Sequence, residues 1–227
     1  MRLNKFIAAT GYCSRREADI LIEKGKVKVN GEVAILGRLV DEIKDKVEVE
    51  NKRVHLEDEK IYIILNKPRG YVTTARDERG RKNIYDIVKL NQRVFSVGRL
   101  DIATEGLLII TNDGKFANDL THPSKKVEKT YIAKDKGEIT DEKINQLITG
   151  VKIEDYITNP AKVRRIGLEE LEIIISEGRN RQVRKMCEVV NLDVSKLRRV
   201  KFGNLELKGL KLGEYRELTA EEIKQII

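Results

Sequence analysis

The chain has 227 residues, of which 40% are hydrophobic and 36% charged, and its formal net charge is +8. This length suits one large domain or a small domain beside a medium one, with enough apolar side chains for a real core. No apolar run approaches the ~20 residues that span a bilayer, and the N-terminus lacks a secretory signal. The two cysteines are far apart and there are only two histidines, so neither a disulfide framework nor a metal site is indicated. We expect a cytoplasmic protein with a polyanionic partner.

The first sixty residues predict two helices followed by short strands. Apolar residues with helical spacing begin at Leu3, and Gly11 ends that helix. The sequence Ser14–Glu17 is a capping box that opens a second helix, which Gly25 terminates. Asn30-Gly31 predicts a tight hairpin turn.

A charged linker at residues 57–60 precedes a buried strand, so we place a domain boundary near residue 58, giving domains 1–58 and 59–227. In the second domain, strands are expected at 61–65, 107–111, 129–134, 171–176 and 198–202, and helices at 115–120, 140–148 and 181–190. Strands do not alternate strictly with long helices. This favours an α+β fold with a largely antiparallel mixed sheet flanked by helices.

The second helix and the hairpin after it carry a group of basic side chains: Arg15, Arg16, Lys24, Lys26 and Lys28. A helix start supplies free amides for phosphate, and neighbouring cations add charge. An ordinary solvated helix is the alternative, because Glu17, Asp19 and Glu23 share the segment.

Three ordered motifs in this segment resemble the S-four (alpha-L) RNA-binding module of a ribosomal protein. They are Arg2–Ile7, Cys13–Ala18 and Gly25–Gly31. The resemblance covers roughly residues 2–50 and implies a small α/β domain that contacts structured RNA by shape and phosphate.

Asp101 is the only acidic residue between Lys89 and Ile102, and it stands between Arg99 and a buried-looking strand. A carboxylate in that setting is costly unless something pairs with it. Asp101 is therefore either half of a structural ion pair or the working acid of an active site.

The sequence around Asp101 resembles the active-site signature of pseudouridine synthases, specifically the RsuA/RluB/RluF branch of bacterial rRNA enzymes. The motifs that carry the resemblance are Gly98–Asp101, Thr104–Leu108, Thr111–Gly114, Leu65–Gly70, Thr121–Pro123, Glu128–Tyr131 and Glu177–Arg184. Together with the S-four module they extend over almost the whole chain. The implied reaction breaks the N1–C1′ bond of uridine, turns the uracil and rejoins it through C5. It needs no metal or redox cofactor. One carboxylate is enough, either attacking C1′ or removing a proton from C2′.

The resemblance also implies roles for individual residues. Asp101 is the catalytic carboxylate, Arg184 the arginine that pairs with it, and Tyr131 the tyrosine that lies against the uracil. Arg99 matches an arginine that helps to replace the extruded base in the stack. The further residues expected to bind RNA are Arg15, Arg16, Lys26, Lys28, Arg179, Asn180, Arg181 and Gln182. Taken singly, Tyr131 is more often a strand-core residue, Arg184 a solvated helix residue, and Asn112-Asp113-Gly114 a hairpin turn.

Within the branch, the motifs look most like the RluF and RluB types, which act on large-subunit (23S) rRNA. Small-subunit (16S) rRNA and tRNA stay open as substrates, and we expect a monomer. A noncatalytic RNA-binding ribosome-assembly factor with the same fold is a second hypothesis. A hydrolytic glycosidase is a third, but it would need a second carboxylate, for which Glu105 is the nearby candidate.

Overall fold

A computed structural model describes residues 1–56, 59–74 and 77–226 of the chain, which divides into two compact units. The first comprises Met1–Ile61, Leu90–Val94 and Thr111–Gly114. The second comprises Tyr62–Lys89, Phe95–Ile110 and Lys115–Ile227. The boundary expected near residue 58 lies outside the described residues, so the division into 1–58 and 59–227 stays a prediction.

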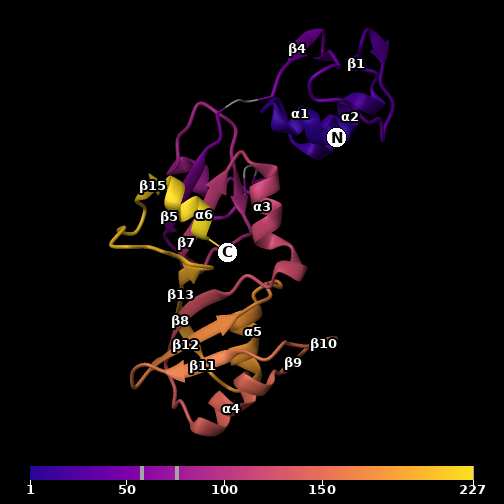
Figure 1. The fold of residues 1–227 in the computed structure, drawn as a ribbon. Coiled ribbons are helices and arrows are strands. Elements are labelled where there is room, and N and C mark those ends of the chain that lie inside the picture. The colour runs from indigo at the N-terminus through magenta and orange to yellow at the C-terminus, as the bar shows by residue number, and fades with distance from the viewer. Residues whose placement is uncertain (57–58, 75–76, 227) are drawn as a thin grey trace. The chain divides into compact units, whose positions relative to one another are not determined.

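The first unit contains two helices and a small antiparallel sheet (Figure 1). Its elements are α1 (Leu3–Ala9), α2 (Arg15–Glu23), β1 (Val27–Val29), β2 (Glu32–Val33), β3 (Val47–Val49) and β4 (Lys52–Val54), with the strand order β2-β1-β3-β4. The Ser14 hydroxyl accepts a hydrogen bond from Glu17 N at 3.1 Å, which is the N-cap interaction predicted for α2. Asn30 and Gly31 have φ values of 54° and 86° and join β1 to β2 in the expected two-residue turn.

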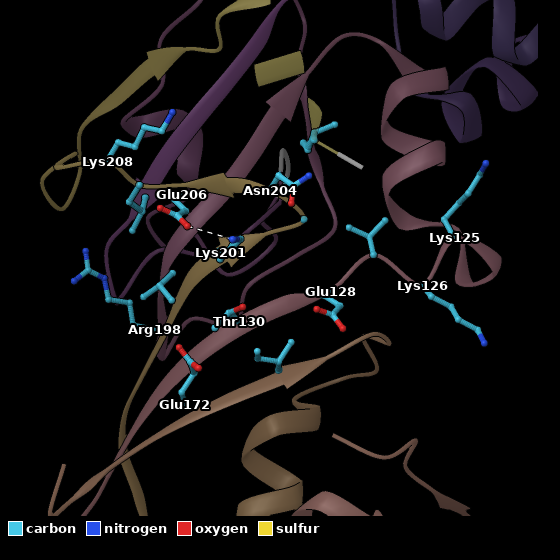
Figure 2. Close-up of a pocket in the computed structure, with 16 residues that line it drawn as sticks. Lys125, Lys126, Glu128, Thr130, Glu172, Arg198, Lys201, Asn204, Glu206 and Lys208 are labelled. Atoms are coloured by element: carbon cyan, nitrogen blue, oxygen red, sulfur yellow. Dashed lines mark ion pairs between the residues drawn. The ribbon is translucent and has the colours of Figure 1, made fainter. Parts of the chain in front are cut away.

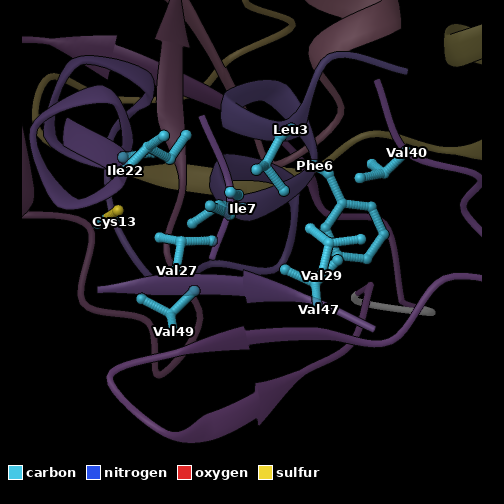
Figure 3. Close-up of a cluster of buried hydrophobic side chains, with 12 residues drawn as sticks. Leu3, Phe6, Ile7, Cys13, Ile22, Val27, Val29, Val40, Val47 and Val49 are labelled. Carbon is cyan, nitrogen blue, oxygen red and sulfur yellow. The ribbon is translucent and has the colours of Figure 1, made fainter. Parts of the chain in front are cut away.

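The core of this unit lies between α1 and one face of the sheet (Figure 3). Val27 and Val29 of β1 are opposite Val49 and Val47 of β3, and all four are buried. Because side chains alternate along a strand, Lys28 lies on the other face. The helices therefore cover the valines and leave the lysine accessible.

The second unit is built on one long sheet with the order β11-β12-β8-β13-β7-β5-β15, to which β14 and β6 add at β13 and β7 (Figure 1). The strands are β5 (Tyr62–Lys67), β6 (Phe95–Val97), β7 (Thr104–Thr111), β8 (Lys129–Asp135), β11 (Lys162–Arg165), β12 (Glu170–Ile175), β13 (Val194–Phe202), β14 (Leu205–Glu206) and β15 (Tyr215–Glu217). β13 runs parallel to β7 and antiparallel to β8. The expected α+β architecture with a largely antiparallel mixed sheet is confirmed.

Helices and short elements connect these strands. They are α3 (Gly114–Thr121), α4 (Asp141–Thr149), α5 (Gln182–Val189), α6 (Ala220–Gln225), the 3₁₀ turns η1 (Ile84–Asp86) and η2 (Pro123–Lys125), and the hairpin β9 (Lys152–Ile153) with β10 (Tyr156–Ile157). The hairpin turn expected at residues 112–114 is wrong, because Gly114 begins α3. The Asn112 amide instead donates to Glu59 O and accepts from Ile61 N, both at 2.9 Å. In the described part of the chain, no helix has the length and apolar character that crossing a bilayer requires.

β7 and β13 approach each other closely at Gly106. Its φ is +109°, and a Cβ built there would lie 2.2 Å from Arg199 O. Only glycine tolerates this contact. The approach holds the middle of β13 against the first residues of β7, directly after the loop that contains Asp101.

Candidate active site

The second unit is hollowed on both faces of its sheet. One hollow, of about 830 Å³, is lined by Thr130 of β8 and Arg198 of β13, among others (Figure 2). The other, of about 600 Å³, is lined by the adjacent residues Tyr131 and Arg199. Because successive strand residues point to opposite faces, the two hollows are separated by the sheet.

The larger hollow offers no free carboxylate among its described lining residues. Its acids form salt bridges, which are Glu128 with Lys162 at 2.6 Å and Glu172 with Arg164 at 2.6 Å. The third pair, Glu206 with Lys201 at 3.2 Å, is marked in Figure 2. Carboxylates already paired with cations are poor candidates for nucleophilic or acid–base work. The smaller hollow is therefore the candidate active site.

The smaller hollow collects predicted site residues from three separate parts of the chain. It contains Asp101, Tyr131 and Arg99, together with the whole segment 179–182. Of the site residues predicted in this unit, Arg184 alone is not in its lining. The ordered motifs of the sequence thus meet in space around one cavity, which is referred to below as the catalytic pocket.

The loop that carries Asp101 is fastened through its backbone. The four consecutive carbonyls of residues 100–103 each accept a hydrogen bond. The donors, in that order, are Thr73 Oγ1 (2.7 Å), Lys67 Nζ (3.2 Å), Gly70 N (2.8 Å) and Arg184 Nη2 (3.0 Å). Such bonds hold a side chain in one position before any substrate binds.

The Asp101 carboxylate itself is half-buried in the pocket. In the described part of the chain it accepts no hydrogen bond and has no cation within 4.0 Å. The prediction that Asp101 and Arg184 form a direct ion pair is therefore wrong: no such pair lies within 4.0 Å in the described residues. The guanidinium of Arg184 is occupied by two carbonyls, donating to Val194 O at 2.9 Å as well as to Ala103 O.

Electrostatic coupling between Arg184 and Asp101 persists at longer range. Burial, with repulsion from Arg181 and Arg69, lowers the pKa of Arg184, and the charge of Asp101 acts in the opposite direction. Arg184 thus binds the loop after Asp101 through Ala103 O and adds positive potential near the carboxylate.

Lys67 is the second charged group that holds this loop. Its side chain is fully buried at the end of β5, and Nζ donates to Thr104 O (2.8 Å), Pro68 O (3.0 Å) and Asp101 O. Burial lowers the pKa of Lys67 to about 8, although Asp101 and Glu105 oppose the shift. The ammonium is retained in the interior because three carbonyls surround it.

The lowered pKa of Lys67 gives a pH-dependent contribution to stability. From about pH 8 to its ordinary value of 10.5, the unfolded chain binds the proton of this lysine more tightly than the folded chain does. Over that range the free energy of unfolding should rise with pH, by at most about 1.4 kcal/mol per pH unit, relative to a Lys67→Met variant. Urea unfolding of both proteins at pH 7, 8, 9 and 10 measures this. The exposed Lys89→Met is the control, and parallel curves for wild type and Lys67→Met would contradict the assignment.

Tyr131 is both a strand residue and part of the pocket. It is buried on β8, directly opposite Arg199 of β13, and its hydroxyl has no hydrogen-bond partner within the described residues. The ring is held by packing while the hydroxyl stays available to a ligand. The strand-core position of Tyr131 is therefore confirmed, and its role against the uracil stays a prediction.

The segment before α5 forms one wall of the pocket. Gln182 is buried, accepting from Arg179 N at 2.9 Å and donating to Glu177 Oε1 at 2.5 Å, so it shapes the segment from within. The Arg179 guanidinium lies 3.8 Å from the centroid of the Tyr156 ring. Asn180 and Arg181 are exposed at this wall.

In the first unit, the cations predicted to bind RNA are accessible. Arg15, Arg16 and Lys26 are exposed and Lys28 is half-exposed. None of the four has an acidic partner within 4.0 Å in the described residues. A cation without an acidic partner is available to a phosphate.

Sequence reasoning did not assign site roles to Lys67, Lys129 or Arg199. Lys67 had a signal, since a lysine that ends an apolar strand directly before proline has little access to water. Lys129 lies two residues before Tyr131 and so shares its face of β8. Arg199 gave no local signal, because its neighbour Arg198 looks identical in sequence but faces the other hollow. Among the described residues, no cluster of three His, Cys, Asp or Glu could hold a metal ion.

Comparison with known proteins identifies the family. The sequence profile described as RNA pseudouridylate synthase matches residues 61–189, more than half of the chain. The "Ribosomal large subunit pseudouridine synthase B" of Bacillus subtilis (strain 168) is 45% identical over 99% of this chain and 95% of its own length. The chain belongs to the RNA pseudouridylate synthase family.

Other similarities extend over both units of this pseudouridylate synthase. The S4 domain profile matches residues 1–50. The "Dual-specificity RNA pseudouridine synthase RluF" of Escherichia coli (strain K12) is 39% identical over 98% of this chain and 77% of its own length. A solved structure titled "Crystal structure of pseudouridylate synthase" covers 100% of both chains with a TM-score of 0.75 and 31% identity. The expected family and its S-four module are confirmed.

Proposed function

We propose that this pseudouridylate synthase converts uridine to pseudouridine in ribosomal RNA, with Asp101 as the catalytic carboxylate. One observation carries the assignment of the residue. Asp101 is an unpaired carboxylate in the pocket, on a loop whose four successive carbonyls are all hydrogen-bonded. A group fixed in place but free of protein partners is suited to act on a substrate atom.

The reaction needs no net change in atoms. The N1–C1′ bond breaks, the uracil turns, a C5–C1′ bond forms, and the proton from C5 is lost while N1 gains one. Asp101 either attacks C1′ or removes the C2′ proton, and both routes remain open. Tyr131, with its unpartnered hydroxyl in the same pocket, is proposed to lie against the uracil and to relay the C5 proton.

We propose large-subunit (23S) rRNA as the substrate, since the Bacillus subtilis relative is named for the large ribosomal subunit. Small-subunit (16S) rRNA and tRNA are the alternative substrates. The relative named as a dual-specificity enzyme supports a second substrate as an alternative. The test is to map pseudouridines in all three RNAs from cells with and without this protein. Loss of a pseudouridine from 23S rRNA alone is expected in cells without the protein, and an unchanged map would refute the proposal.

The N-terminal cations are proposed to bind RNA through its phosphates. Replacing Arg15 and Arg16 by alanine should weaken RNA binding and reduce the slope of log K against log salt concentration by about 1.4 to 1.8. Filter binding over a salt series measures the slope, and the unfolding temperature should stay unchanged because both side chains are exposed. An unaltered salt dependence would refute the proposal that Arg15 and Arg16 bind RNA phosphates.

We propose that the protein is a cytoplasmic monomer. It acts without a metal or redox cofactor, because the reaction is a rearrangement.

The alternative that the protein is a hydrolytic glycosidase is weakened by the position of Glu105. This residue is buried on β7, lies outside the pocket lining and forms a salt bridge with Lys196 at 3.0 Å. A noncatalytic RNA-binding factor would require Asp101 to be dispensable, which the activity of an Asp101→Asn variant tests.

A further inference from the structure

One wall of the catalytic pocket carries buried positive charge that the proposed chemistry has not yet used. Arg199 of β13 lines the pocket and is only 2% exposed. Its Nε donates to Leu107 O at 2.8 Å, which fixes the plane of the guanidinium. In the described residues, its Nη2 is buried and has no hydrogen-bond partner.

A buried guanidinium N–H without a partner is unfavourable, because it has lost its hydrogen bonds to water and gained none in the protein. Carboxylates do not satisfy it, since no acidic oxygen of the described residues lies within 4.0 Å of Arg199. A ligand oxygen in the pocket would supply the missing acceptor. The same wall also contains the aromatic ring of Phe202, whose centroid is 5.1 Å from the Arg199 guanidinium carbon.

Lys129 adds a second cation at this wall. It lines the pocket on the same face of β8 as Tyr131, with Nζ donating to Val127 O at 2.8 Å and lying 5.4 Å from the Phe202 centroid. Burial and then repulsion from Arg199 lower the pKa of Lys129 to about 8, while Glu177 opposes the shift. Two cations held close together in a poorly solvated pocket favour a ligand that bears negative charge.

The register of the sheet places the Arg199 guanidinium beside Tyr131, the residue proposed to lie against the uracil. Arg199 is the direct cross-strand neighbour of Tyr131. Side chains opposite each other on one face of an antiparallel pair have Cβ atoms about 4.5–5.5 Å apart. A uracil lying against Tyr131 therefore has its edge within reach of the Arg199 guanidinium.

Breaking the N1–C1′ bond creates such a charge. Whether Asp101 attacks C1′ or removes the C2′ proton, the bonding electron pair leaves with N1, and the detached uracil is an anion whose charge is shared with O2 and O4. We propose that Arg199 is a further catalytic residue, donating from Nη2 to a uracil oxygen and stabilising this anion, with Lys129 as the supporting cation. The inference rests on the proposed function of the pocket, and it holds for either route.

The test compares two substrates in single-turnover kinetics. Arg199→Gln should slow the reaction of a uridine-containing RNA by about 10²–10³-fold, as is usual when a donor to a developing anion is removed. In RNA with 5-fluorouridine at the target position, the fluorine itself stabilises the departing anion. The rate at which Arg199→Gln consumes 5-fluorouridine should therefore be reduced about tenfold less than its rate with uridine. A residue that only supports the fold would slow both substrates equally, and equal losses would overturn the proposal.

The neighbouring arginine provides a matched control. Arg198→Gln changes the same strand on the opposite face of the sheet, where it lines the other hollow (Figure 2), and should leave both rates unchanged. Thermal unfolding checks each variant. If Arg199→Gln does not fold, Lys129→Gln should show a weaker version of the same substrate dependence, and no such dependence would equally overturn the proposal. A wild-type protein that forms no pseudouridine would instead refute the proposed function.

Discussion

Replacing Asp101 by asparagine should abolish pseudouridine formation while the protein still folds and binds RNA. The side chain keeps its size but loses both its negative charge and its basicity, so it can neither attack C1′ nor remove a proton. A positioned proton-transfer group ordinarily contributes about 10²–10⁴-fold, and loss of a nucleophile removes the pathway altogether. The measurement is pseudouridine formed in a single turnover on an rRNA fragment that contains the target.

Stability should change little in this variant, because the carboxylate makes no hydrogen bond or ion pair among the described residues. The loop is held through carbonyls, which the substitution leaves intact. Thermal unfolding and RNA affinity within error of the wild type are therefore the necessary controls. An Asp101→Asn protein that retained activity would remove Asp101 from the mechanism.

Replacing Arg184 by methionine should lower kcat by about 10²-fold with little change in KM. The substitution frees Ala103 O and Val194 O and takes positive charge away from the neighbourhood of Asp101. Small displacements of a reacting group cost rates of this size. Each freed carbonyl also loses a charge-assisted hydrogen bond, so the free energy of unfolding should fall by about 1.5–3 kcal/mol for each of the two bonds.

Two variants separate positioning from a general loss of stability. Lys185→Met removes the next cation of α5, which pairs with Glu154 at the surface, and should leave kcat unchanged. Arg184→Lys keeps the charge but cannot reach two carbonyls in the same planar geometry, and should recover part of kcat. An Arg184→Met protein as active as the wild type would show that the loop does not depend on this residue.

Elements with strong local signals were predicted well from the sequence. The apolar run after Glu105 became the fully buried strand β7, and the serine cap and the Asn30-Gly31 turn are present. β11 was missed because it lies at the edge of the sheet and three of its four side chains are exposed, so the chain shows no apolar pattern there.

The candidate site could be predicted as a set of residues but not as a set of contacts. Asp101 stood out as an isolated acid, whereas the donors to its loop are distant in the sequence. Lys67 is 34 residues from Asp101, and Arg184 is 81 residues from Ala103. The expected ion pair assumed that an arginine near a carboxylate binds it. Unpaired backbone carbonyls compete for the same guanidinium, and only the tertiary structure reveals them.

The four bonded carbonyls of residues 100–103 also decide where entropy is lost. Their donors come from β5, from the residues that follow it and from α5, so the loop is ordered when the second unit folds. Its conformational freedom is therefore surrendered during folding rather than during the encounter with RNA. The rearrangement that brings a nucleotide to Asp101 then falls to the nucleic acid, and a uridine whose neighbours hold it weakly is the one that reaches the carboxylate at least cost.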